Sequence, residues 1–135
     1  MTVTASQLAA SNSVGTETTT DTGGGQDVGW INNSSWLEYT GVNFGSGLNS
    51  VTARIASPLT QSATGGEIQF RMDSLTAAPF ATIPVTDTGG WQNWVTTPAV
   101  TASPVPGGTH TLYVTFTSSQ GGNFVNVNDF TFGTG

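Results

Sequence analysis

Tryptophan is the residue type in this sequence with the clearest capacity for recognition chemistry. A planar indole can stack on the apolar face of a sugar ring while polar neighbours hydrogen-bond the sugar hydroxyls. Of the four tryptophans, Trp30 follows the stretch 23–29, which is too flexible and polar to lie in a core, so we expect it to be exposed at the end of a loop. Trp91 directly follows Gly89-Gly90 and is also expected at a loop edge. Trp94 lies further into a strand and is expected to be buried.

Trp36 is harder to place, because its position on a strand admits two interpretations. Leu37 and Tyr39 point to one face of the expected strand, so Trp36 shares the opposite face with Glu38 and Thr40. That face is either the polar outer surface of a sheet or partly buried. For any single tryptophan of a small β domain, a place in the core is the competing interpretation.

The titratable residues select no catalytic centre. The sequence has eight carboxylates, no cysteine and a single histidine, His110, which lies among threonines and is expected at the surface. The acidic residues do not follow the spacing of a calcium-binding loop. A glycoside hydrolase needs only two carboxylates facing each other across a cleft, so that class of enzyme remains open, but spacing selects no such pair.

The charge of the chain restricts its partners. Its 135 residues carry a net charge of −6, and Arg54 and Arg71 are its only Lys or Arg side chains. Two scattered cations cannot compete for phosphate, which excludes nucleic acid and, for the same reason, an anionic membrane surface. No apolar run approaches the roughly 18 residues of a membrane span, and residues 1–4 do not resemble a signal peptide. We expect a monomer.

Apolar residues alternate with polar ones along much of the chain, which is the pattern of half-buried β-strands. The alternation is clearest in 51–55, 68–72 and 112–116. Further strands are expected around 36–42, 80–85, 92–97 and 124–132, the last with a slip that indicates a β-bulge. Turns rich in glycine and proline separate these runs. The pattern predicts one all-β domain over residues 1–135, a β-sandwich of two antiparallel sheets.

Five sequence blocks are similar to those of family 6 carbohydrate-binding modules. They occur in the family's order and spacing and comprise 21–31, 36–39, 71–74, 88–94 and 125–128. The glycine-rich first block and the Gly-Gly-Trp-Gln-x-Trp pattern of the fourth are the most specific. The resemblance implies a jelly-roll β-sandwich attached, in a secreted parent protein, to an enzyme that degrades polysaccharide.

The resemblance also implies a sugar-binding cleft formed by loops at one edge of the sandwich. In that cleft two aromatic rings clamp one sugar, and the matching residues here are Trp30 and Trp91. An amide and a carboxylate hydrogen-bond its hydroxyls, and these match Asn126 and Glu17. Some members use a second site on the concave face of a sheet, where the aromatic residue matches Trp36.

The structural calcium of the family is not expected at its usual place in this chain. The family holds it with a Glu-x-Glu pair and an Asp near the C-terminus, and these positions match Thr4, Ser6 and Asn128. Calcium requires several oxygen ligands with net negative charge, so replacing three carboxylates by neutral groups weakens such a site severely. An ion elsewhere stays open, and no other cofactor is expected.

The sequence thus predicts a non-catalytic module that binds a β-linked polysaccharide, xylan or β-glucan, and targets an attached glycoside hydrolase to its substrate. Two alternatives stay open: a small glycoside hydrolase, and a surface or adhesion β-sandwich without a glycan ligand. Asn126 and Asn128 share one expected strand but are predicted to differ in role, because only Asn126 matches the sugar-binding position.

Overall fold

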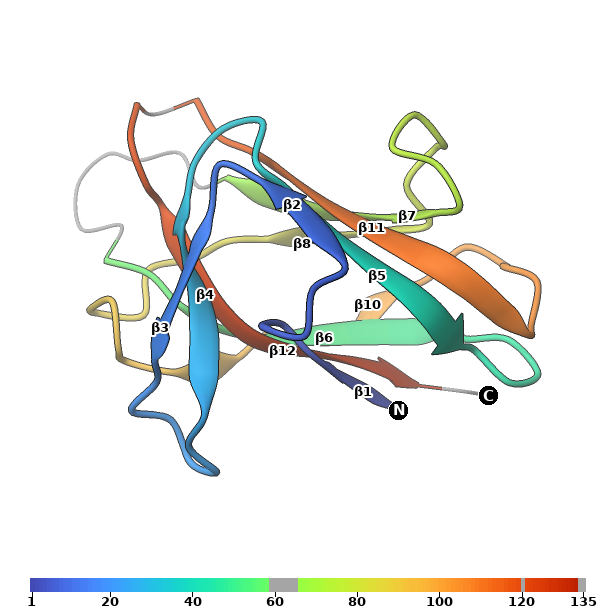
Figure 1. Ribbon diagram of the computed structural model, residues 1–135, viewed down its shortest axis with the longest axis horizontal. Helices are drawn as coiled ribbons and strands as arrows, with labels where there is room; N and C mark the ends of the chain where they lie inside the picture. The colour runs from blue at the N-terminus through green and yellow to red at the C-terminus, as the bar shows by residue number, and fades with distance from the viewer. Residues whose placement is uncertain (59–65, 120, 134–135) are drawn as a thin grey trace.

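The computed structural model describes residues 1–58, 66–119 and 121–133, and strands joined by turns make up this part of the chain (Figure 1). Within it, no helix is long and apolar enough to cross a membrane. The strands are β1 Thr2–Thr4, β2 Ala10–Asn12, β3 Gly15–Thr18, β4 Gln26–Ile31, β5 Trp36–Asn43, β6 Ser50–Ala56, β7 Glu67–Met72, β8 Ala81–Pro84, β9 Val95–Thr96, β10 Val100–Thr101, β11 Thr109–Thr117 and β12 Val125–Gly133.

These strands form two antiparallel sheets that pack face to face (Figure 1). The larger sheet has the order β10-β6-β12-β4-β3, with β1 added to β12 and β9 added to β6. The smaller sheet has the order β2-β5-β11-β7-β8. The predicted β-sandwich is therefore confirmed, and β3 forms an edge of the larger sheet, next to the functional site described below.

The core lies between the sheets and consists of the apolar residues that alternate along the central strands. The predicted inward rows of β6 and β11 are buried; they are Val51, Ala53, Ile55, Leu112, Val114 and Phe116. Phe70 on β7 joins the two sheets, because its ring meets Phe130 and Phe132 of β12 edge-on, with ring centres 5.3 Å and 5.9 Å away. Each such pair adds about 0.5–1.5 kcal/mol to the stabilisation by burial.

Two parts of the chain differ from the expectation. The strand expected over 92–97 is only the short β9, because residues 91 and 92 form a turn. Trp94 lies in the segment before β9, outside the sheet, and is half-buried instead of buried; its indole N–H donates to Gln92 Oε1 (3.2 Å). Strands β1 to β4 and β10 carry too little apolar alternation to be predicted, and pairing with longer neighbours defines them.

The irregularity predicted for the C-terminal strand is confirmed in β12. Its pairing shifts register opposite β4 between Val125 and Val127, and opposite β6 between Val127 and Asp129. A bulge interrupts the regular alternation and changes the face of the sheet to which neighbouring side chains point. Both asparagines of the strand, Asn126 and Asn128, lie at these shifts, and both are buried.

His110 connects β11 to two neighbouring segments and is partly exposed. Its Nδ1 lies 2.8 Å from Asp73 Oδ2, and its Nε2 lies 3.0 Å from the carbonyl oxygen of Gly107. Because both ring nitrogens face acceptors, the protonated imidazole is favoured. The Gly107 carbonyl and then the Asp73 carboxylate raise the pKa of His110 above its ordinary value.

His110→Gln tests this contact, which is strongest while the imidazole is protonated. The raised pKa means that the contact stabilises the fold fully below the ordinary value of 6.5 and is lost as pH rises through the folded-state pKa. We expect the melting temperature of wild type to exceed that of H110Q most at acidic pH, and the difference to shrink above pH 6.5. Thermal melts across this range measure it; a difference independent of pH contradicts the ion pair.

Candidate functional site

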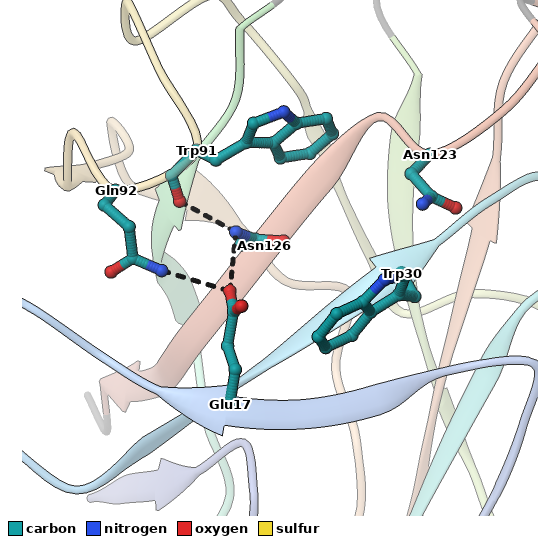
Figure 2. Close-up of a pocket in the computed structure, with 6 residues that line it drawn as sticks. All are labelled: Glu17, Trp30, Trp91, Gln92, Asn123 and Asn126. Atoms are coloured by element: carbon teal, nitrogen blue, oxygen red, sulfur yellow. Dashed lines mark hydrogen bonds between the residues drawn. The ribbon is translucent and has the colours of Figure 1, made fainter.

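One cleft at the edge of the sandwich gathers the side chains that the sequence predicts for a binding site (Figure 2). It has a volume of about 290 Å³ and is lined by Glu17, Trp30, Trp91, Gln92, Asn123 and Asn126. Strands β3, β4 and β12 supply Glu17, Trp30 and Asn126, and the turn before β9 supplies Trp91 and Gln92. The site therefore depends on the pairing of strands that are distant in sequence.

Trp30 is exposed as predicted, but it projects from a strand and not from a loop. Residues 26–31 form β4, and residues 27–29, expected to be too polar for a core, are buried. Trp30 has a φ of 57°, in the left-handed region that bulky residues rarely adopt. It lies at the point where the pairing of β4 with β12 shifts register. This bulge turns the indole outward and leaves 51% of the residue exposed.

Two glycines allow the close packing of this site. A Cβ on Gly15 of β3 would lie 3.0 Å from Cε3 of Trp30, so the indole rests directly against the glycine backbone. A Cβ on Gly29 would lie 3.0 Å from Asn126 Oδ1 and 3.5 Å from Glu17 Oε1. Only glycine permits such an approach without displacing the cleft side chains.

Trp91 stands on a turn and is 41% exposed, which confirms the prediction for its position. The preceding Gly89 has a φ of 97°, a conformation that favours glycine. The Thr88 hydroxyl donates to the Gly90 carbonyl oxygen (3.3 Å) and accepts from the Ser57 N–H (2.8 Å), which ties the turn to the end of β6. The turn therefore presents the indole from a supported backbone.

Asn126 forms part of the floor between the two indoles (Figure 2). Its Nδ2 donates to the main-chain oxygen of Trp91 (2.7 Å) and to Glu17 Oε1 (3.3 Å). The amide nitrogen is thus committed to the protein. Its Oδ1 points into the cleft, so the group that Asn126 offers to a ligand is an acceptor.

Gln92 is held by hydrogen bonds at both ends of its amide. Its Oε1 accepts from Thr20 N–H (2.9 Å), the Thr20 hydroxyl (3.0 Å) and Trp94 Nε1 (3.2 Å). Two of these partners can only donate, which fixes the orientation of the amide. Its Nε2 therefore donates to Glu17 Oε1 (3.0 Å) and to Asp27 Oδ2 (3.1 Å).

Asp27 lies beneath the cleft, directly opposite Glu17 in the pairing of β3 with β4, and has no exposed surface. Its Oδ1 has no hydrogen-bond partner among the described residues. Burial is the main effect that raises the pKa of Asp27 to about 7. Hydrogen bonding to Glu17 and the negative charge of Glu17 act in the same direction. Since Gln92 binds both carboxyl groups and Asp27 is buried, the pair cannot stand on either side of a glycosidic bond as hydrolytic carboxylates do.

Glu17, Trp30, Trp91 and Asn126 thus lie around one cleft, whereas three further residues belong to the site without a clear sequence signal. Gln92 and Asn123 line the cleft, and Asp27 lies under it. Gln92 stands inside the conspicuous Gly-Gly-Trp-Gln pattern, which is the one signal that pointed to it. Nothing in the spacing of the carboxylates pairs Asp27 with Glu17.

Trp36 lies apart from this cleft, on the outer face of the smaller sheet. It begins β5 and is half-buried, with its ring edge-on to Tyr113 of β11 at 6.5 Å between ring centres. Leu37 and Tyr39 face the core, as the alternation predicts. The two interpretations of Trp36, an outer surface and a partly buried face, therefore each hold in part. Trp36 lies on the outer face of the sheet, and its ring is partly covered.

The three positions matched to calcium ligands carry uncharged side chains, Thr4, Ser6 and Asn128. Thr4 is exposed, Ser6 is half-buried, and Asn128 turns its amide N–H to Asp21 Oδ2 (3.0 Å). Asp21 accepts two further hydrogen bonds from Arg54, each 2.9 Å, and this guanidinium lowers the pKa of Asp21. No three Asp, Glu, His or Cys side chains gather as a metal site in the part of the chain that the structure describes.

An antiparallel β-sandwich with two exposed indoles around a polar floor has the architecture of a carbohydrate-binding domain. The profile described as "Carbohydrate binding module (family 6)" matches residues 4–134. The chain belongs to this family of non-catalytic sugar-binding modules, which confirms the resemblance seen in the sequence blocks.

Solved structures and curated relatives agree with this assignment. A β-1,3-glucan-binding family 6 module from Bacillus halodurans superposes with a TM-score of 0.89 and 34% identity, covering 99% of this chain and 96% of that one. A family 6 module from Clostridium cellulolyticum in complex with xylose gives 0.85 and 35%, covering 98% and 95%. The arabinoxylan arabinofuranohydrolase of Paenibacillus polymyxa is 34% identical over an alignment of 136 residues. The alignment covers 96% of this chain and 20% of the enzyme. The chain therefore spans about a fifth of that relative.

Asn126→Ala and Asn128→Ala compare two buried asparagines of β12 with different surroundings. Asn126 supports Trp91 and Glu17 and exposes Oδ1 to the cleft, whereas Asn128 bonds to Asp21. We expect N126A to weaken glycan binding at least tenfold, which is about 1.4 kcal/mol. N128A is expected to leave the affinity nearly unchanged. Titration calorimetry with a xylo- or cello-oligosaccharide measures both, and equal losses contradict the assigned roles.

Proposed function

We propose that this chain binds a β-linked polysaccharide, xylan or β-glucan, in the cleft between Trp30 and Trp91. The observation that carries the proposal is the pair of exposed indoles on either side of a supported polar floor (Figure 2). Exposed aromatic area rimmed by polar groups is typical of a ligand site. A pyranose ring offers an apolar face to an indole and hydroxyls to the groups between the rings.

The polar groups of the cleft favour a neutral ligand that donates hydrogen bonds. Glu17 and Asn126 Oδ1 are acceptors, which suits the hydroxyl groups of an uncharged sugar. A polyanionic glycan would be repelled by Glu17 and by the net charge of −6. The β-1,3-glucan and the xylose of the two structural relatives are neutral ligands and are consistent with this chemistry.

We also propose that the chain acts as a monomeric module of a longer, secreted enzyme that degrades polysaccharide. The arabinofuranohydrolase it resembles is much longer than this chain, which covers 20% of it. Tethering to the polysaccharide raises the effective concentration of an attached catalytic domain near its substrate. In Figure 1 the N-terminus at the start of β1 lies apart from the edge strand β3, so a domain joined there would not have to cover the cleft.

The outer face of the smaller sheet is a second candidate for sugar binding. Trp36 and Tyr113 place an edge-on aromatic pair there, beside Glu38 on β5. This arrangement again combines a partly exposed ring with polar neighbours. It lacks a second exposed indole, so we expect weaker binding than in the cleft.

Trp30→Ala and Trp91→Ala are each expected to abolish measurable glycan binding in the cleft, leaving at most the weaker binding proposed for the outer face of the smaller sheet. Stacking on an exposed ring contributes to affinity and little to the core, so the free energy of unfolding should change by less than about 1 kcal/mol. Affinity electrophoresis against xylan, a mixed-linkage β-glucan, the uncharged hydroxyethyl cellulose and laminarin measures binding, and urea unfolding measures stability. Trp36→Ala is the matched control, because it removes an indole outside the cleft and should retain binding.

Binding and the release of reducing sugar together distinguish a binding module, a hydrolase and a domain without a glycan ligand. Retention of wild type without release of reducing sugar supports a binding module, whereas release of reducing sugar supports a hydrolase. Absence of binding across the panel supports a surface domain without a glycan ligand. Loss of binding in W36A with retention in W30A would move the site to the outer face of the smaller sheet.

We further propose that the fold does not depend on calcium at Thr4, Ser6 and Asn128. The Arg54 guanidinium already neutralises Asp21 beside Asn128, which supports this proposal. A ligand stabilises the folded state only in proportion to its affinity for it. The melting temperature should therefore be nearly the same in excess calcium and in chelator, and a large upward shift in calcium would contradict the proposal.

A further inference from the structure

Glu17 and Asp27 form an opposed carboxyl pair under the proposed sugar site. They are cross-strand partners on β3 and β4, where two like charges destabilise a sheet. Gln92 offers one N–H to each of them, and its amide nitrogen has no third hydrogen to give. Asp27 Oδ1 is left buried and without a partner among the described residues. Two ionised carboxylates would therefore be poorly accommodated here.

A single proton on Asp27 removes both difficulties. It abolishes the contact between like charges, and it makes the buried carboxyl a donor that Glu17 can accept. The pKa of Asp27, raised to about 7 by burial and by Glu17, agrees with a proton held at this place near neutral pH. The other polar neighbours of Asp27 are uncharged: hydrogen bonding by Gln92 and by Thr19 lowers its pKa but does not outweigh burial, and β12 brings the neutral Asn126 to the same floor.

We propose that Asp27 is a positioning residue of the glycan site: it shares one proton with Glu17, holds the Glu17 carboxylate toward the cleft, and so makes glycan binding depend on pH. The inference rests on the function proposed above for the cleft. When the proton leaves, the fully buried Asp27 cannot move into solvent. Glu17 is only half-buried and lies on the edge strand β3, so its side chain turns outward and the cleft loses an acceptor.

The remaining charged groups near this part of the sheet form a separate set. Asp21, Arg54 and Asp129 interact with one another, and Asp129 and Arg54 are opposite partners of β12 and β6. The pKa of His110 is also raised, by the Gly107 carbonyl and then by Asp73, but neither of these partners lines the cleft. Among the titratable groups of the described residues, Glu17 is the one whose charge acts on Asp27.

The experiment is titration calorimetry of the intact chain with the oligosaccharide that the panel identifies, at pH values from about 5.5 to 8.5. The dissociation constant of wild type should be constant at the acidic end and rise by up to about tenfold per pH unit above neutrality. Asp27→Asn keeps the shape of the protonated acid and its donor, so its affinity should match the acidic wild type and vary less than about twofold with pH. Buffers of different ionisation enthalpy should show proton uptake on binding at alkaline pH in wild type only.

Two controls and a direct titration complete the test. His110→Gln and Asp129→Asn remove groups that titrate elsewhere, and both should keep the pH dependence of wild type. Carbon-13 NMR of the side-chain carboxyl groups in the free protein should show Asp27 titrating far above an ordinary aspartate. A flat wild-type profile, a slope that persists in D27N, or an ordinary titration of Asp27 overturns the inference while glycan binding stands. Absence of binding at every pH instead overturns the function proposed for the cleft.

Discussion

The hydrogen bonds of the Gln92 amide connect the parts from which the cleft is built. Its oxygen accepts from Thr20 and Trp94, and its nitrogen donates to Glu17 and Asp27. These contacts join the turn that carries Trp91 to the edge strand β3 and to its neighbour β4. Because every donor and acceptor of the amide is used, the turn has one favoured position, and the spacing between the indoles and the polar floor follows from it.

The backbone of the site is strained at one residue, and the surrounding strands hold that residue in its conformation. Trp30 occupies a left-handed conformation at a bulge, and its ring rests against Gly15. Residues held in sparsely populated conformations cost of order 1–3 kcal/mol each and persist only when their surroundings determine them. Here β4 lies between β3 and β12, so strand pairing on both sides holds the strained residue in place.

Charge is handled differently in the two polar clusters of the larger sheet. Asp21 is neutralised by the bidentate contact with Arg54, a pairing of matched geometry that keeps its carboxylate ionised. Asp27 has no cation among its hydrogen-bond partners, and its burial favours the neutral acid instead. The ion pair of Asp21 and Arg54 therefore stays charged beside β12, whereas the protonation state of Asp27 under the cleft is proposed to change with pH.

The sequence predicted the exposure of Trp30 but placed it at the end of a loop, whereas a register shift between β4 and β12 turns it outward from a strand. The strands with strong apolar alternation, the bulge of β12 and the exposure of Trp91 were determined by the sequence alone. These follow from local chemistry, since alternation defines which face is buried and glycine pairs mark where the chain turns. The tertiary structure decided that Trp30 stands on a strand, that Trp94 is half-buried, and that Asp27 lies against Glu17. Those facts depend on strand pairing between segments distant in sequence, and the register of such pairs is set by the packing of the whole sandwich rather than by neighbouring residues.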